Sequence, residues 1–185
     1  MARWQPDAKG RLREAAITLF IERGYDAVTV ADIAKRAGLT KRTFFNHFED
    51  KREVMFADAE QFEAAIVDAL AGADPELDPL DATVLAYTQG AATLADNPDL
   101  VRARNEMLAS SKELQERELM KTASLTAKLA DVLVQRGVPQ RDALFIAQAG
   151  TSIFLTAIRE WTDDPEHGLE NAMQNALAGF KTAVA

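Results

Sequence analysis

A short basic segment around residue 45 is rich in side chains that hydrogen-bond to nucleic-acid bases. The stretch "KRTFFNHF", residues 41–48, follows Gly38 and combines Lys41 and Arg42 with the amide of Asn46. Arginine pairs with guanine edges and asparagine with adenine edges in the major groove, which is wide enough for one helix. These residue types predict a helix whose N-terminal part contacts DNA bases.

On a helical wheel with roughly 100° per residue, the segment has an apolar and a polar side. Phe44 and Phe48 fall together and are expected to pack inward on Leu19, Ile33 and Ala34. Arg42, Thr43 and Asn46 point the opposite way, while Lys41 and Phe45 lie on one flank and His47 lies on the other. Two aromatic anchors would thus hold a basic outer face.

Three of these residues keep two interpretations each. Arg42 either reads a base or binds a phosphate. Phe45 is either exposed toward DNA or buried. His47 either contacts a phosphate or is satisfied by a backbone carbonyl at the edge of the core.

Further candidates for phosphate contact lie at the predicted helix starts. Thr29 and Thr40 each precede a helix, where free backbone N–H groups attract anions. Lys51 and Arg52 add cationic side chains at the start of the next helix. Such contacts fix the register of a protein on DNA rather than its sequence preference.

The surrounding elements are those of a helix-turn-helix. "LREAAITLFIERG" has apolar residues at helical spacing and ends at Gly24. Thr29 and Asp32 form a capping box that opens a second helix, which Gly38 ends. The third helix is expected from Thr40 through Phe48. A longer helix from Asp50 to about Ala71 should link this module to the rest of the chain. Ligand binding in the body is expected to tilt this helix and so move the DNA-binding module.

The rest of the chain is also predicted to be helical. A break with Pro75 and Pro79 is followed by helices over residues 80–96, 98–110, 112–136, 140–161 and 166–182, and no strand alternation occurs. The expected fold class is all-α, with an N-terminal three-helix helix-turn-helix DNA-binding domain and a larger helical ligand-binding and dimerisation domain. The predicted domains are residues 1–52 and 53–185.

Charge is divided unevenly between these two parts. Residues 1–52 hold 11 Lys and Arg against 7 Asp and Glu, whereas residues 53–185 hold 10 against 22. The first part is therefore suited to a polyanion although the chain has a net charge of −8. The chain has no cysteine, which excludes disulfides and thiolate metal sites. No segment resembles a signal peptide or a membrane span, so a cytoplasmic protein is expected.

The segment "TVADIAKRAGLTKRTFFNHFEDK" resembles the DNA-binding signature of TetR-family transcriptional regulators. The resemblance covers about 45 residues when the first helix is included. It implies that Thr29, Thr40, Phe45, His47 and Lys51 lie near the DNA backbone, with Lys41, Arg42, Thr43 and Asn46 nearest the bases. Phe45 departs from the tyrosine common in the family and lacks its hydroxyl. Arg42 stands where a glycine or small residue is frequent.

The resemblance also implies a double-stranded DNA operator, a small-molecule effector and a homodimer formed by the last two long helices, about 140–161 and 166–182. The first of these helices is apolar on nearly every face, which fits either a dimer interface or the central helix of a monomer. A hydrophobic or amphipathic effector is expected between the helices of the body. Its candidate lining is Tyr87, Gln89, Thr93, Met107, Met120 and Phe154.

Other classes of function find less support. The two histidines, His47 and His167, lie in separate segments, and no glycine-rich phosphate loop occurs, so no enzyme, cofactor or metal is expected. The remaining alternative is a helical ligand-binding or interaction module without specific DNA binding. The sequence favours a ligand-responsive repressor that binds a palindromic operator as a dimer.

Overall fold

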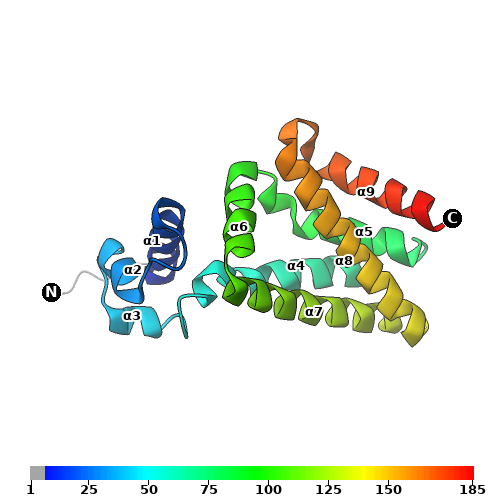
Figure 1. The fold of residues 1–185 in the computed structure, drawn as a ribbon. Coiled ribbons are helices and arrows are strands. Elements are labelled where there is room, and N and C mark those ends of the chain that lie inside the picture. Colours follow the sequence, from blue (N-terminus) through cyan, green and yellow to red (C-terminus); the bar gives the residue numbers. More distant parts are fainter. Residues whose placement is uncertain (1–6) are drawn as a thin grey trace. The chain divides into compact units, whose positions relative to one another are not determined.

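The computed structural model describes residues 7–185, in which the regular elements are helices (Figure 1). The predicted all-α fold class is confirmed. The chain divides into two compact units. The first unit comprises the residues up to Asp58 together with Ala103–Glu118, and the second comprises Ala59–Arg102 and Leu119–Ala185. None of the helices within residues 7–185 combines the length and apolar character needed to cross a membrane.

The first unit begins with three helices, α1 (Ala8–Arg23), α2 (Val30–Arg36) and α3 (Lys41–Phe45). The capping box predicted at the start of α2 is present, because Asp32 N donates to Thr29 Oγ1 and Thr29 N donates to the Asp32 carboxylate. The predicted glycine stop after α1 is also confirmed, and Gly24 N donates to Phe20 O at 2.9 Å.

The turn between α2 and α3 requires a glycine. Gly38 has φ +66°, a left-handed conformation that residues with a Cβ rarely adopt. Leu39 N then reaches back to Ala34 O at 2.8 Å, and the Arg11 guanidinium of α1 donates to Ala37 O. These bonds satisfy carbonyls at the end of α2 and hold the turn against α1.

The core of the first unit lies beneath α3. Phe44 is fully buried and Phe48 is 5% exposed, with their ring centroids 5.4 Å apart. The buried residues of α1 and α2 complete this core: Leu12, Ala15, Ala16, Leu19, Phe20, Ile33 and Ala34. The inward orientation predicted for Phe44 and Phe48 is confirmed.

Two helices predicted between Thr40 and Ala71 differ in the structure. The third α-helix ends at Phe45, and a hydrogen-bonded turn continues it, in which Phe48 N donates to Phe44 O at 2.9 Å. The helix predicted from Asp50 to Ala71 is divided into a 3₁₀ turn, η1 (Glu53–Phe56), and α4 (Ala59–Ala71). The division lies at the boundary between the two compact units. Val54 and Phe56 are buried in the first unit, whereas Ile66 is buried in the second.

The second unit is a bundle of long helices. Its own helices are α4, α5 (Pro79–Gly90), α8 (Gln140–Asp163) and α9 (Gly168–Val184). Helix α5 packs against α4 and α8, and α8 packs against α9. Two further helices, α6 (Pro98–Ser110) and α7 (Lys112–Gln135), contribute residues to both units. The helix predicted over residues 80–96 ends at Gly90, and the 3₁₀ turn η2 (Ala92–Leu94) follows it.

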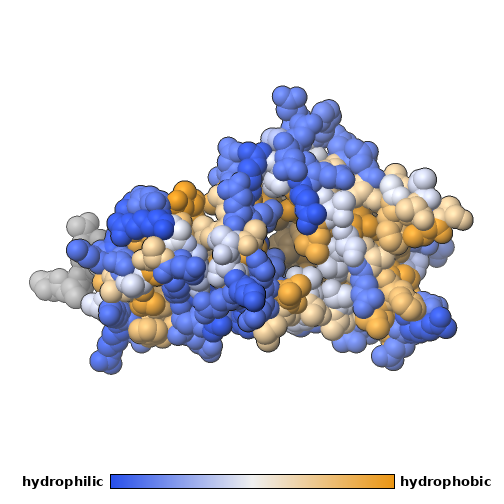
Figure 2. All heavy atoms as spheres, in the orientation of Figure 1, coloured by the Kyte–Doolittle hydropathy of each residue, from blue (hydrophilic) through white to orange (hydrophobic). Residues whose placement is uncertain are grey.

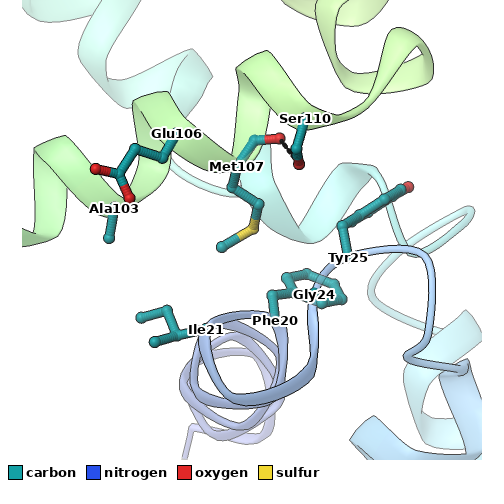
Figure 3. A pocket seen from close by; sticks show the side chains of 8 residues that line it. All are labelled: Phe20, Ile21, Gly24, Tyr25, Ala103, Glu106, Met107 and Ser110. Carbon is teal, nitrogen blue, oxygen red and sulfur yellow. Dashed lines mark hydrogen bonds between the residues drawn. The ribbon is translucent and has the colours of Figure 1, made fainter.

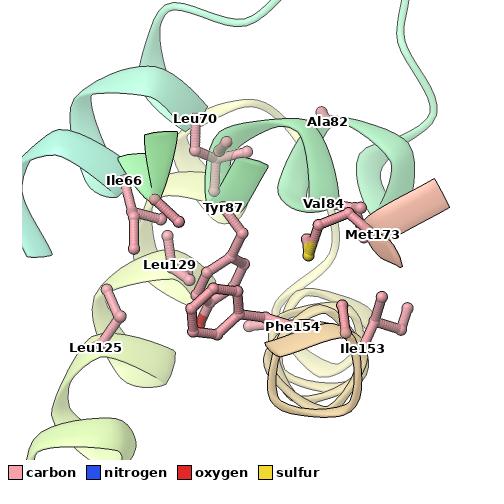
Figure 4. Close-up of a cluster of buried hydrophobic side chains, with 14 of the residues drawn as sticks. Ile66, Leu70, Ala82, Val84, Tyr87, Leu125, Leu129, Ile153, Phe154 and Met173 are labelled. Atoms are coloured by element: carbon pink, nitrogen blue, oxygen red, sulfur yellow. The ribbon is translucent and has the colours of Figure 1, made fainter. Parts of the chain in front are cut away.

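Close helix packing in the second unit depends on two glycines. A Cβ at Gly90 of α5 would lie 3.1 Å from Ile66 N of α4, and a Cβ at Gly150 of α8 would collide with the side chain of Thr83. Around these crossings the core is filled by large side chains, with Tyr87 and Phe154 stacked at 4.7 Å between centroids (Figure 4).

Helix α8 is apolar on both sides. Ala143, Ala147 and Phe154 face the core, while Leu144 and Phe145 are 47% and 57% exposed. Leu155 is 46% exposed. Figure 2 shows hydrophobic side chains reaching the surface over α8 and α9, whereas hydrophilic side chains cover α6. Helix α8 therefore carries more apolar side chains than the described part of the chain buries by itself.

The domain boundary predicted after residue 52 stays a prediction. Residues 1–6 of the predicted DNA-binding domain lie outside the described part of the chain. The compact units change at Asp58, and residues 103–118 join the first unit, so packing groups the helix-turn-helix with the α6–α7 corner.

The substitution Gly90→Ala tests the close approach of α5 to α4. Because the added Cβ meets backbone atoms of Ile66, we expect a loss of about 1–3 kcal/mol in the free energy of unfolding, measured by urea denaturation. Gly72→Ala is the control, since its Cβ would make an ordinary 3.4 Å contact with Asp68 O. Equal stability of the two variants would contradict the packing described.

Candidate nucleic-acid interface

The outer face of α3 is polar, basic and exposed. Lys41, Arg42, Asn46 and His47 are exposed, and Thr43 is partly exposed. Phe45 is 56% exposed, with its ring edge on Phe44 at 5.5 Å between centroids. The sequence left open whether Phe45 is exposed or buried and whether His47 lies at the edge of the core. In the structure both side chains are exposed, beside the basic residues of the same short segment.

The Thr40 hydroxyl fixes the first turn of α3. Thr43 N donates to Thr40 Oγ1 at 3.1 Å, and the hydroxyls of Thr40 and Thr43 lie 2.9 Å apart. A capped first turn holds Lys41 and Arg42 at the end of the helix that enters the groove in helix-turn-helix proteins. Thr40 therefore positions its neighbours, whatever its own contact with DNA.

At Thr29 a carboxylate accompanies the predicted phosphate contact. The Thr29 hydroxyl and N–H both bind Asp32, and these hydrogen bonds, the side-chain bond first, lower the pKa of Asp32. The carboxylate is thus ionised at neutral pH and repels a phosphate close to it. The predicted role of Thr29 stays a prediction, with this charge opposing it.

Lys51 ties the end of the helix-turn-helix to the α1–α2 connection. Its ammonium donates to Tyr25 O at 2.8 Å and to Val28 O at 3.1 Å, and it lies 4.0 Å from the centroid of the Tyr25 ring. An ammonium has three donors, so two of them are occupied inside the protein. Lys51 therefore acts structurally, and its predicted phosphate contact rests on the remaining donor.

A cluster of ion pairs joins residues 50–53 to the start of α7. Arg52 pairs with Asp50 and lies 3.1 Å from Glu113 Oε1, while Arg117 Nε lies 2.7 Å from Glu53 Oε1. The hydrogen bond from Arg52 holds the pKa of Asp50 below its usual value. We call these five residues the corner cluster. No local pattern of residues predicts this cluster, because Glu113 and Arg117 are about 60 residues from their partners Arg52 and Glu53 in the chain.

Comparison with known proteins agrees with this geometry. Residues 12–57 match the family model described as "Bacterial regulatory proteins, tetR family". IcaR of Staphylococcus aureus, a negative transcriptional regulator of the biofilm operon icaADBC, is 41% identical over 46 residues, a quarter of each chain. MftR of Mycobacterium tuberculosis, named for transcriptional regulation of mycofactocin biosynthesis, is 25% identical over 178 residues, which are 90% of this chain and 85% of MftR.

The chain carries the DNA-binding region of a TetR-family transcriptional regulator. Members of this family regulate transcription and are not enzymes. Solved structures share its fold over nearly the full length. SmeT of Stenotrophomonas maltophilia in complex with triclosan has a TM-score of 0.66 at 20% identity, covering 95% of this chain and 90% of SmeT. FadR of Thermus thermophilus in complex with lauroyl-CoA has a TM-score of 0.58 at 21% identity, covering 93% and 92%.

The six predicted ligand-binding residues of the regulator are dispersed. Tyr87 and Phe154 are buried and stacked in the second unit. Gln89 and Thr93 are exposed, and Met120 is 64% exposed. Met107 is buried in the first unit. The structure thus brings only Tyr87 and Phe154 together, because the apolar pattern of α5, α6 and α7 does not specify which unit each face meets.

Arg42→Ala tests whether the exposed guanidinium reads a base. Loss of a base contact is expected to cost about 1–3 kcal/mol on the specific site and to relax selectivity at one base pair, measured by titration of the cognate duplex and single-base variants. Arg36→Ala is the control, since Arg36 is exposed on α2 and pairs with Glu22. Equal weakening on every duplex would assign Arg42 to a phosphate instead.

Proposed function

We propose that this regulator binds a palindromic operator as a homodimer, represses transcription there, and is released by a small hydrophobic or amphipathic effector. The observation that carries the proposal is the exposed basic face of α3 above the buried Phe44 and Phe48. Lys41, Arg42, Thr43 and Asn46 would lie nearest the bases. Thr40, Phe45 and His47 would flank the backbone, with Lys51 and Thr29 as weaker contacts. Because its partner is DNA, the cytoplasm is the proposed location.

The proposed dimer forms through α8 and α9. Leu144, Phe145 and Leu155 give α8 an exposed apolar face, and Ala178 and Gly179 give α9 exposed small residues. Large apolar side chains of one protomer against small residues of its partner would permit close helix packing. Two-fold symmetry of such a dimer would place two α3 helices on the two halves of a palindrome.

The proposed effector site is the interior of the second unit beside Tyr87 and Phe154. The Tyr87 hydroxyl lies 2.8 Å from Thr151 Oγ1, which lies 3.0 Å from Thr126 Oγ1. Thr151 and Thr126 also contact the carbonyls of Ala147 and Thr122. Burial raises the pKa of Tyr87 to about 12, so its hydroxyl keeps its proton at neutral pH.

These hydroxyls favour an effector that brings a hydrogen-bond donor. Tyr87, Thr126 and Thr151 supply one proton each, but four close contacts compete for them. All three protons are used within the protein, so toward a ligand these hydroxyl oxygens can only accept. A donor attached to an apolar body would therefore suit them. The triclosan and lauroyl-CoA complexes of the structural neighbours support ligands with large apolar parts. The exposed Gln89, Thr93 and Met120 contribute less to this site, and Met107, which is buried in the first unit, is not part of it.

Transmission from effector to DNA would use α6 and α7 as well as α4. The sequence singled out the helix of residues 50–71 as the connecting element, but that segment is interrupted after Phe56. Helices α6 and α7 are continuous and belong partly to each unit. The corner cluster fastens the start of α7 to residues 50–53, so a shift of α7 would be passed to the helix-turn-helix.

Selection of bound sequences from random duplex DNA tests the DNA-binding part of the proposal. We expect a palindromic consensus and a steep decrease of affinity with salt, because Lys and Arg that neutralise phosphates release counterions. Weak, salt-insensitive binding without a consensus would instead favour the alternative, a helical ligand-binding or interaction module.

Leu155→Arg tests the proposed interface. A charge on the exposed face of α8 is expected to shift the protein from dimer to monomer in analytical ultracentrifugation and to weaken operator binding. Leu119→Arg is the matched control, because Leu119 is 69% exposed on α7, outside the proposed interface. A dimer that survives Leu155→Arg but not Leu119→Arg would place the interface elsewhere.

A further inference from the structure

A cavity in the first unit has no role in the function proposed above. It lies between α1 and α6 and has a volume of about 240 Å³ (Figure 3). This volume is below the usual range for drug-sized ligands. Its lining comes from both helices and the residues after α1: Phe20, Ile21, Gly24, Tyr25, Ala103, Glu106, Met107 and Ser110.

The apolar part of the lining suits an aromatic ring. Phe20 and Tyr25 are each 2% exposed, and their ring centroids are 5.1 Å apart. The Met107 side chain extends from α6 toward α1 (Figure 3), and methionine sulfur packs favourably against aromatic rings. Ile21 is 57% exposed on the α1 side, so a bound ring would also remove apolar surface from water.

Apart from the Tyr25 hydroxyl, which donates to Glu113 Oε2 at 3.5 Å, the lining has two polar side chains, and both offer acceptors. Glu106 presents an exposed carboxylate. Ser110 Oγ donates its single proton to Met107 O at 2.8 Å, so toward a ligand it can only accept. A ligand that fits this pair must bring donors, and opposite charge to Glu106 adds attraction.

Neighbouring cations do not neutralise this preference. Lys51 lies on the Tyr25 ring but is outside the lining, and its ammonium is bound to the carbonyls of Tyr25 and Val28. Arg52 is paired with Asp50 and Glu113. The lining itself contains one carboxylate and no lysine or arginine.

We infer that this cavity is a second small-molecule site, separate from the effector site, and that it binds a small aromatic ammonium ion. The ring would lie against Phe20, Ile21 and Met107, and the ammonium would be held by the Glu106 carboxylate. Such a ligand contacts α1 and α6 together, so it stabilises the arrangement in which these two helices are adjacent.

The test is a titration of the full chain, labelled with [methyl-¹³C]methionine, with 2-phenylethylammonium and its neutral analogue 2-phenylethanol. We expect saturable shifts of the Met107 methyl, while Met120 and Met173 in the second unit stay unchanged. The ammonium should bind about five- to tenfold more tightly than the alcohol, as expected for one exposed ion pair with aromatic neighbours.

Two matched variants distinguish specific binding in this cavity from general attraction of a cation to an acidic protein. Glu106→Gln should reduce ammonium affinity to that of the alcohol, whereas Glu116→Gln, an exposed carboxylate outside the lining, should leave it unchanged. Equal affinity of the two compounds, an unchanged Met107 signal, or equal effects of the two variants would overturn the inference. No DNA is involved, so the result is independent of the proposed repressor function.

Discussion

The burial of two phenylalanines beneath α3 is the constraint on which the proposed DNA reading depends. Helix α3 has five residues, far fewer than an isolated helix needs to persist in water. Its conformation therefore comes from Phe44 and Phe48, whose rings are held in the core of α1 and α2. Because the inner face supplies the stability, the outer face is free to carry Lys41, Arg42 and Asn46, which contribute little to folding.

The contacts around α3 extend this constraint outward. Gly38 and the Arg11 bond to Ala37 O set the angle between α2 and α3. Lys51 fastens the end of the module to the α1–α2 connection, and the corner cluster fastens residues 50–53 to α7. The helix-turn-helix and the α6–α7 corner thus form one compact unit. We infer that a change in α6 or α7 moves this unit as a whole rather than distorting α3.

Local features of this protein were predictable from sequence because local chemistry decides them. The Thr29–Asp32 capping box, the glycine ends of α1 and α2, and the inward Phe44 and Phe48 all follow from spacing over a few residues. Tyr87 and Phe154 were predicted to line a ligand site, which stays a prediction, and their burial in one stack depends on the packing of α5 against α8. The local features agree with one another across several residues, which is why the fold class was recoverable.

Features that depend on tertiary partners were not predictable. The interruption after Phe56 reflects which unit buries Val54 and which buries Ile66, and no residue nearby marks it. Glu113 and Arg117 lie in a highly charged stretch of the sequence, and nothing near them marks their partners, Arg52 and Glu53 from a distant segment. Met107 and Met120 have the same apolar character, but one is buried and the other is 64% exposed.

Hydroxyl-radical footprinting of the full chain on its selected duplex would show whether two α3 helices of one dimer read the DNA. We expect two protected patches related by two-fold symmetry, about one helical turn or slightly more apart on one face of the duplex. A single asymmetric patch, or protection without any dyad, would contradict this expectation.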